Sequence, residues 1–253
     1  MDPDDQLQAL EGAGDAFARV AAATPPGAPV PTCPGWDVDQ LTRHLGKVHR
    51  WAATIVGTPL DQALGFGGFD AGAPQAGDAV VPWFREGHAR LVRALREAPP
   101  DLECWSFLPA PTPRAFWCRR QAHETVVHLV DLALAAGLPP DSPGWEPAPA
   151  FAADGIDELL RGWMRGRAPE PGAEEPSLRV VATDHALDWQ LTFPGRRGVT
   201  LVAGPGATPA TCTVRARAVD LYLLLWNRRS VEGLQVDGDV TTLERWATSR
   251  QVH

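Results

Sequence analysis

Apolar residues recur every three to four positions through most of the first 136 residues, the spacing that places them on one face of an α-helix. The pattern predicts an opening helix that ends at Thr24-Pro25 and a second helix that begins after Asp37, with Gln40 completing a capping box. It predicts two further helices over about 79–98 and about 114–136. Four helices with one long connection favour a helical bundle.

The pattern changes beyond about residue 145. One more helix is expected over about 150–165, and a linker rich in Pro, Glu and Gly, APEPGAEEP, follows it. Period-two alternation then predicts short strands, an apolar helix, another strand and a closing helix. The segments, in order, are LRVVAT, LDWQLTF, GVTLVAG, ATCTVRA, AVDLYLLLWNRR, VEGLQVDGD and VTTLERWATSR. The fold class is therefore predicted as α+β, with a helical bundle over residues 1–145 and a small α+β domain over 146–253.

Composition narrows the classes of partner and location. The 23 basic and 31 acidic residues give a net charge of −8 without a long basic block, which favours neither nucleic acid nor an anionic membrane as a partner. The acidic start MDPDDQ does not resemble a signal peptide, and no apolar run approaches the roughly 18 residues of a membrane span. The cysteines form no C-x-x-C pair and are interpreted as reduced packing residues of a cytoplasmic protein. They are Cys33, Cys104, Cys118 and Cys212.

The stretch RQAHETVVHLVD, residues 120–131, resembles the zinc-binding sequence HExxH, but its histidines are five positions apart. At 3.6 residues per turn, His123 and His128 lie about 140° apart around a helix and cannot share one ion. Glu124 and His128 are four positions apart and offset by about 40°, so they share a face. The sequence therefore predicts a Glu-x-x-x-His ligand pair, to which a catalytic metal must add a third ligand.

Two histidines on apolar helix faces, His44 and His88, are candidates for the third ligand. His49 is expected on the polar side of its helix, because it lies about 140° from His44. A single histidine on an apolar face is more often a hydrogen-bonded core residue than a ligand. The Glu-x-x-x-His pair favours a metal site in the bundle, since a buried carboxylate is costly unless it is paired or binds a metal.

Three segments resemble the mycothiol-dependent maleylpyruvate isomerase family. VPTCPGWDVDQLTRHLGKVHRWA and RRQAHETVVHLVDLALAAG resemble its N-terminal, DinB-like metal-binding bundle, and TVRARAVDLYLLLWNRRSVEGLQVDGDVTTLERW resembles its C-terminal α+β domain. The resemblance implies the metal ligands His44, Glu124 and His128. It also implies a catalytic arginine at the end of the LLLWNRR helix, best matched by Arg228, with Arg229 as the alternative register.

The same resemblance implies an enzyme that uses a divalent metal such as Zn²⁺ to activate the thiol of mycothiol. Its activity would be isomerisation of, or sulfur transfer to, a small electrophilic substrate, in a monomer or homodimer. A cleft between the two domains, reached by Arg228, is the expected entrance. Two alternatives stay open: a metal-dependent hydrolase or lyase that uses bound water, and a non-catalytic metal-binding or regulatory protein.

Two further features have two interpretations each. Asp131, three residues after His128, either orients that ligand or is an exposed helix residue. Trp36, Trp51 and Trp117 either form the wall of a pocket near the metal or fill the core.

Overall fold

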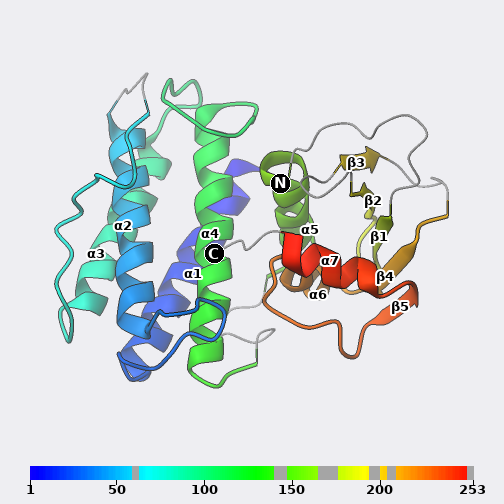
Figure 1. Ribbon diagram of the computed structural model, residues 1–253. Helices are drawn as coiled ribbons and strands as arrows, with labels where there is room; N and C mark the ends of the chain where they lie inside the picture. Colours follow the sequence, from blue (N-terminus) through cyan, green and yellow to red (C-terminus); the bar gives the residue numbers. More distant parts are fainter. Residues whose placement is uncertain (59–62, 140–146, 165–175, 194–199, 204–208, 250–253) are drawn as a thin grey trace. The chain divides into compact units, whose positions relative to one another are not determined.

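The chain divides into two compact units, Met1–Glu146 and Pro147–His253, which are described separately below. The computed structural model (Figure 1) describes all residues except 59–62, 140–146, 165–175, 194–199, 204–208 and 250–253.

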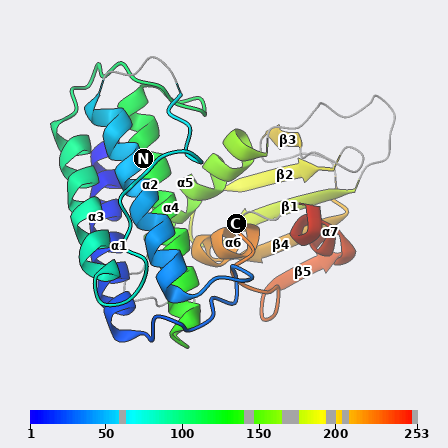
Figure 2. The same ribbon diagram turned by 60° about the vertical axis from the view of Figure 1, so that its left-hand side comes forward.

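The described part of the first unit forms four long helices that lie side by side in Figures 1 and 2. They are α1 (Pro3–Ala23), α2 (Val38–Gly57), α3 (Val80–Glu97) and α4 (Pro113–Ala135). Helix α1 packs against α3 and α4, and α2 packs against the same two helices. The predicted helices and their approximate ends are confirmed.

The ends of α2 and α4 follow from local sequence. At the start of α2, Asp37 Oδ1 accepts a hydrogen bond from the backbone N–H of Gln40 at 2.7 Å, and Gln40 Oε1 accepts one from the N–H of Asp37 at 2.9 Å. This reciprocal capping box is the one predicted from the sequence. Helix α4 is capped by the Thr112 side chain and ends before Gly137, whose φ of 72° lies in the left-handed region that glycine adopts without strain.

The interior of the bundle contains His49 and His88 among large apolar side chains such as Phe17 and Phe84. His49 is 0% exposed, so the prediction that it lies on the polar side of its helix is wrong. Its ring lies beside that of His88, with centroids 5.2 Å apart and the two ring planes tilted by 40°. Helix α2 packs against both α3 and α4. These two neighbours bury a larger part of its circumference than the single apolar face read from the sequence, and His49 lies in that part.

The described residues of the second unit form a five-stranded sheet in the order β3-β2-β1-β4-β5, in which only the β1–β4 pair is parallel (Figure 2). Helix α5 and a following π-helical turn, η1, precede the sheet in the chain. Helix α6 lies between β4 and β5, and α7 follows β5. The bounds are α5 Pro149–Glu158, η1 Leu159–Trp163, β1 Ser177–Ala182, β2 Asp188–Thr192, β3 Thr200–Ala203, β4 Cys212–Ala216, α6 Ala218–Leu225, β5 Gln235–Gly238 and α7 Thr241–Ser249. The α+β fold class is confirmed. The predicted linker APEPGAEEP falls, apart from its last residue, outside the described residues.

Alternation along β1 gives the sheet one covered face. Leu178 and Val180 are fully buried, whereas Arg179 between them is partly exposed and forms an ion pair with Asp188 on β2. Helix α6 contacts β1 and β4, and α7 contacts β1. The two helices are joined to each other by a hydrogen bond from Trp246 Nε1 to the carbonyl oxygen of Leu225 at 3.1 Å.

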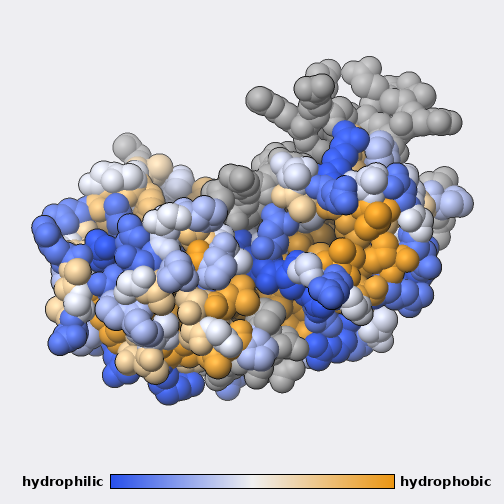
Figure 3. Space-filling model, turned by 60° about the horizontal axis from the view of Figure 1, so that its bottom comes forward, coloured by the Kyte–Doolittle hydropathy of each residue, from blue (hydrophilic) through white to orange (hydrophobic). Residues whose placement is uncertain are grey.

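Hydrophilic and hydrophobic residues are interspersed on the face of the molecule drawn in Figure 3. The exposed large hydrophobic residues of the described chain are Met1, Leu138, Trp163 and Val240, which are far apart in the sequence. No helix in the described ranges combines the length and the apolar character that crossing a bilayer requires.

Candidate metal centre

Three side chains from α2 and α4 converge inside the bundle. His44 Nε2 lies 3.5 Å from Glu124 Oε1, and His128 Nε2 lies 3.3 Å from the same oxygen. The His44 and His128 rings have centroids 5.1 Å apart. One ligand atom from each of the three residues lies within 4.8 Å of the other two. The four-residue spacing of Glu124 and His128 puts both on one face of α4, as the sequence predicts.

The distances suit a small tetrahedral ion. Zinc ligands at about 2.0–2.2 Å in tetrahedral geometry lie roughly 3.3–3.6 Å from each other. The two nitrogen-to-oxygen distances of 3.5 Å and 3.3 Å fall at these values. Two imidazoles and a carboxylate are ligand types that catalytic zinc sites use, with a fourth position left for water or substrate. The residues therefore fit a divalent cation.

The carboxylate of Glu124 is oriented by a neighbour one turn earlier on α4. Arg120, which is 2% exposed, donates from Nη2 to Glu124 Oε2 at 3.1 Å. Burial alone would raise the pKa of Glu124, but hydrogen bonds from His128 and His44 and the charge of Arg120 outweigh it and hold that pKa well below its ordinary value. Glu124 is therefore ionised, with Oε2 bound to Arg120 and Oε1 directed at the two histidines.

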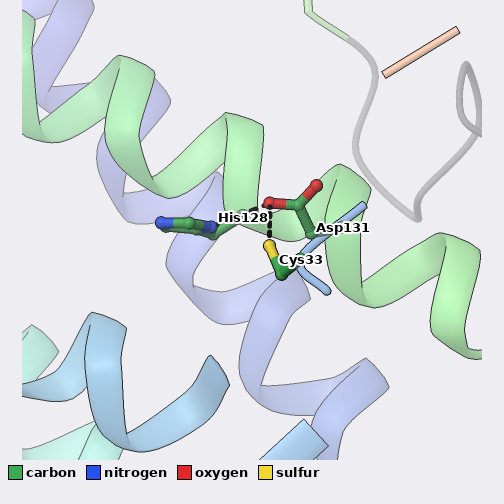
Figure 4. A group of neighbouring side chains, drawn as sticks. All are labelled: Cys33, His128 and Asp131. Atoms are coloured by element: carbon green, nitrogen blue, oxygen red, sulfur yellow. Dashed lines mark hydrogen bonds and ion pairs between the residues drawn. The ribbon is translucent and has the colours of Figure 1, made fainter. Parts of the chain in front are cut away.

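A second carboxylate, that of Asp131, binds the ring nitrogen of His128 that faces away from Glu124. This nitrogen, Nδ1, lies 2.9 Å from Asp131 Oδ2, and Asp131 is 0% exposed (Figure 4). Burial lowers the pKa of His128, but the hydrogen bonds to Asp131 and Glu124 raise it more, to about 9. With Nδ1–H donated to Asp131, Nε2 is the nitrogen that faces Glu124, the arrangement in which a histidine binds metal through Nε2. The interpretation of Asp131 as an exposed helix residue is wrong.

Aromatic rings surround His44. The Trp36 ring lies 4.9 Å from the His44 ring between centroids, and the Phe66 ring lies 5.9 Å from it. Trp51 and Trp117 instead belong to an aromatic cluster, with ring centroids 5.3 Å apart, and Trp117 is 0% exposed. Trp36 is thus beside the candidate metal centre, whereas Trp117 fills the core. Phe66 was not expected from the sequence, because it lies in a Gly-rich segment without periodicity.

Comparison with known proteins shows the family of the chain. Residues 2–133 match the family model of the mycothiol maleylpyruvate isomerase N-terminal domain, and residues 150–245 match that of the MDMPI C-terminal domain. The chain belongs to the mycothiol maleylpyruvate isomerase family. The family resemblance seen in the sequence is therefore confirmed.

Two solved structures share the fold of this family member across both domains. A crystal structure of a histidine-to-alanine mutant of the mycothiol-dependent maleylpyruvate isomerase matches with a TM-score of 0.64, and a crystal structure of the mycothiol-dependent maleylpyruvate isomerase matches with 0.60. Each is 15% identical and is matched over 95% of both chains. The search of curated proteins returns no match.

The histidine that was the alternative ligand lies elsewhere in the bundle. Among the described residues, His88 belongs to neither group that is able to hold a metal, and its ring stacks on Phe84 with centroids 6.0 Å apart. His123 is 0% exposed and is also outside both groups. The structure therefore brings His44, not His88, to Glu124 and His128.

The predicted catalytic arginine lies just after α6 in the C-terminal unit. Arg228 is 4% exposed, and its Nη1 donates to the carbonyl oxygen of Trp226 at 2.8 Å. Asn227 before it has a φ of 59°. The adjacent Arg229 forms a close ion pair with Asp220 and donates to the carbonyl oxygen of Glu232. The catalytic role of Arg228 stays a prediction.

Proposed function

We propose that this family member is an isomerase or S-transferase in which a divalent cation, bound by His44, Glu124 and His128, activates mycothiol for attack on a small electrophile. One observation carries the proposal: both imidazole Nε2 atoms face the same oxygen of Glu124, at 3.5 Å and 3.3 Å. Family membership supports the thiol, and the donor set supports Zn²⁺ among divalent cations.

Each side chain around the site has a definite task in this proposal. His44 and His128 would supply nitrogen ligands, and His128, whose pKa of about 9 keeps it protonated in the metal-free protein, would lose its Nε2 proton when the cation binds. Glu124 would supply one anionic oxygen while Arg120 binds the other. Asp131 holds the tautomer of His128 that leaves Nε2 for the metal. The bound cation would lower the pKa of a coordinating thiol, so that a thiolate nucleophile is available at neutral pH.

The reaction needs no cysteine of the protein. The sulfur of mycothiol would form a C–S bond to one carbon of a conjugated carbon–carbon double bond. The former double bond is then a single bond, about which the substrate rotates. Elimination then breaks the C–S bond and restores the double bond in the other geometry. If the adduct takes up a proton and leaves, the result is sulfur transfer instead. Both outcomes need the same three metal ligands.

Arg228 is proposed as the cation that recognises a carboxylate of the substrate or a polar group of mycothiol. A planar guanidinium binds a carboxylate through two parallel hydrogen bonds, which lysine does not do. The burial of Arg228 and its hydrogen bond to the Trp226 carbonyl support a fixed orientation of this group.

The test uses His128→Ala, with His123→Ala as the matched control on the same helix. Both histidines are buried, at 3% and 0% exposure, so the two substitutions remove similar packing. Metal content is measured after purification, and isomerisation of maleylpyruvate is measured with and without mycothiol. We expect His128→Ala to lose metal and activity and His123→Ala to keep both.

Other results would select a different function. Turnover of a substrate without any thiol would favour the hydrolase or lyase hypothesis. Metal binding without thiol-dependent chemistry on any electrophile tested would favour a regulatory protein. Equal metal loss in the two variants would contradict the assignment of His128 as a ligand.

A further inference from the structure

The loop between α1 and α2 carries two side chains that form hydrogen bonds with Asp131, the carboxylate bound to His128 Nδ1. Thr32 donates from Oγ1 to Asp131 Oδ1 at 2.5 Å. The Cys33 Sγ atom lies 3.6 Å from Asp131 Oδ2, within hydrogen-bonding distance for sulfur (Figure 4). Asp131 Oδ2 also accepts from His128 Nδ1. The loop therefore has a donor on each oxygen of a carboxylate that is fully buried.

The loop itself is closed by backbone hydrogen bonds. Val30 donates to the carbonyl oxygen of Trp36 at 2.9 Å, Cys33 donates to that of Val30 at 3.1 Å, and Trp36 donates to that of Cys33 at 3.0 Å. Val38, the first residue of α2, donates to Ala28 at 3.1 Å. These bonds hold Thr32 and Cys33 in fixed positions relative to the start of α2.

The same loop reaches the other imidazole of the site. Trp36 packs on His44 with ring centroids 4.9 Å apart. One short segment thus contacts His44 directly and contacts His128 through Asp131. Because those two histidines come from different helices, the loop is placed to set the distance between them.

A second metal ion is the competing interpretation of these contacts, because Cys33, His128 and Asp131 also have ligand atoms within 4.8 Å of one another. The distance between His128 Nδ1 and Asp131 Oδ2 is 2.9 Å, which is the length of a hydrogen bond. Two ligands of one tetrahedral zinc ion would lie roughly 3.3–3.6 Å apart. The distance between His128 and Asp131 therefore favours a shared proton over a metal ion between these two groups.

We propose that Thr32 and Cys33 are positioning residues of the metal centre. By donating to both oxygens of Asp131 they fix the carboxylate that sets the tautomer and orientation of His128. This inference rests on the proposed function, because it needs His128 to be a metal ligand. Outer hydrogen-bond partners of this kind typically change metal affinity by about 10–100-fold when they are removed.

The experiment compares substitutions that remove a donor with substitutions that keep one. Thr32→Val and Cys33→Ala remove the hydrogen bonds to Asp131, whereas Thr32→Ser and Cys33→Ser keep a hydroxyl donor. Thr54→Val is the control, because the Thr54 hydroxyl donates to the carbonyl oxygen of Arg50 in its own helix. Zinc affinity and stoichiometry are measured by competition with a chromophoric chelator, and the unfolding temperature of each metal-free protein is measured in parallel.

We expect Thr32→Val and Cys33→Ala to weaken zinc binding by about 10-fold or more. We expect the two serine variants and Thr54→Val to bind zinc like the wild type. Equal affinity in the valine and serine variants at position 32 would overturn the inference. A loss of one zinc per chain in Cys33→Ala, with the remaining site unchanged, would overturn it in favour of a second metal ion. Failure of the wild type to bind zinc would instead overturn the proposed function.

Discussion

The Nε2 atom of His128 lies 3.3 Å from Oε1 of Glu124, one helical turn earlier on α4. The same oxygen faces His44, and the other carboxylate oxygen is bound by Arg120. Glu124 is therefore the residue through which both histidines and the buried arginine interact. Its replacement is the sharpest test of the electrostatics of the site.

Glu124→Gln keeps the size of the side chain and removes its charge. We expect metal affinity to fall by more than the roughly 10–100-fold typical of residues outside the ligand set, because an anionic ligand is lost. The metal-free variant should also be less stable, since the buried guanidinium of Arg120 loses its ion pair with Glu124. Metal titration and thermal unfolding check both effects. Glu103→Gln, at an exposed position in the same unit, is the control and should change neither.

Arg228→Gln tests the proposed cation of the C-terminal domain. Glutamine can still donate to the Trp226 carbonyl but carries no charge. Loss of a charged hydrogen bond to substrate, worth about 1.5–3 kcal/mol, should lower kcat/KM by roughly 10–100-fold while metal content and unfolding temperature stay near wild type. Arg229→Gln is the matched control and should keep activity. The reverse result would move the catalytic role to Arg229.

The buried imidazole of His49 predicts a loss of stability in acid. Burial, followed by the charge of His88, holds the pKa of His49 well below its ordinary value. Folded His49 therefore stays neutral at a pH where the unfolded chain, with a pKa of about 6.5, takes up a proton. The contribution of neutral His49 to the free energy of unfolding is therefore fully present above about pH 6.5 and is lost as the pH falls below that value.

Denaturant unfolding of His49→Gln and wild type at two pH values isolates this effect. Between about pH 7.5 and about pH 5.5, the wild type should lose about 1 kcal/mol more unfolding free energy than the variant. The Thr125 hydroxyl donates its proton to the carbonyl oxygen of Gln121, so it accepts from His49 Nε2, a contact that a glutamine amide can replace. The same pH dependence in both proteins would show that His49 is not the group responsible.

Gly14 on α1 is required by the packing of His88. A Cβ atom at this position would lie 2.2 Å from His88 Cε1. Alanine favours a helix over glycine by about 1 kcal/mol, but overpacking typically costs about 1–3 kcal/mol, so we expect Gly14→Ala to destabilise the bundle. Gly57→Ala, where the new Cβ meets nothing within 4 Å, should not. Adding His88→Ala to Gly14→Ala should make the Gly14 substitution itself less destabilising, and unchanged cost in that background would refute the steric explanation.

The sequence predicts the features that depend on short-range spacing. The capping box of Asp37 and Gln40 and the shared face of Glu124 and His128 depend only on helix geometry, and both are present in the structure. The choice of His44 over His88 needed the family resemblance, because both lie on apolar faces. In the structure His44 lies beside Glu124 and His128 because α2, which carries His44, packs against α4.

Other contacts depend on how segments without periodicity fold back on the helices. Thr32 and Cys33 are 99 and 98 residues from Asp131 in sequence, and no pattern links them. Cys33 was interpreted only as a packing residue. The burial of His49 was mispredicted for a related reason, since one helix's own pattern does not show how many neighbours will cover it.

The central claim is that the metal centre binds and activates the thiol of mycothiol. Its most direct test is the absorption spectrum of the cobalt-substituted protein during titration with mycothiol. Direct binding of the thiolate to cobalt predicts a new sulfur-to-cobalt charge-transfer band in the near ultraviolet that saturates at one thiol per metal and is absent in His128→Ala. A cobalt spectrum that does not change at saturating mycothiol would contradict the account.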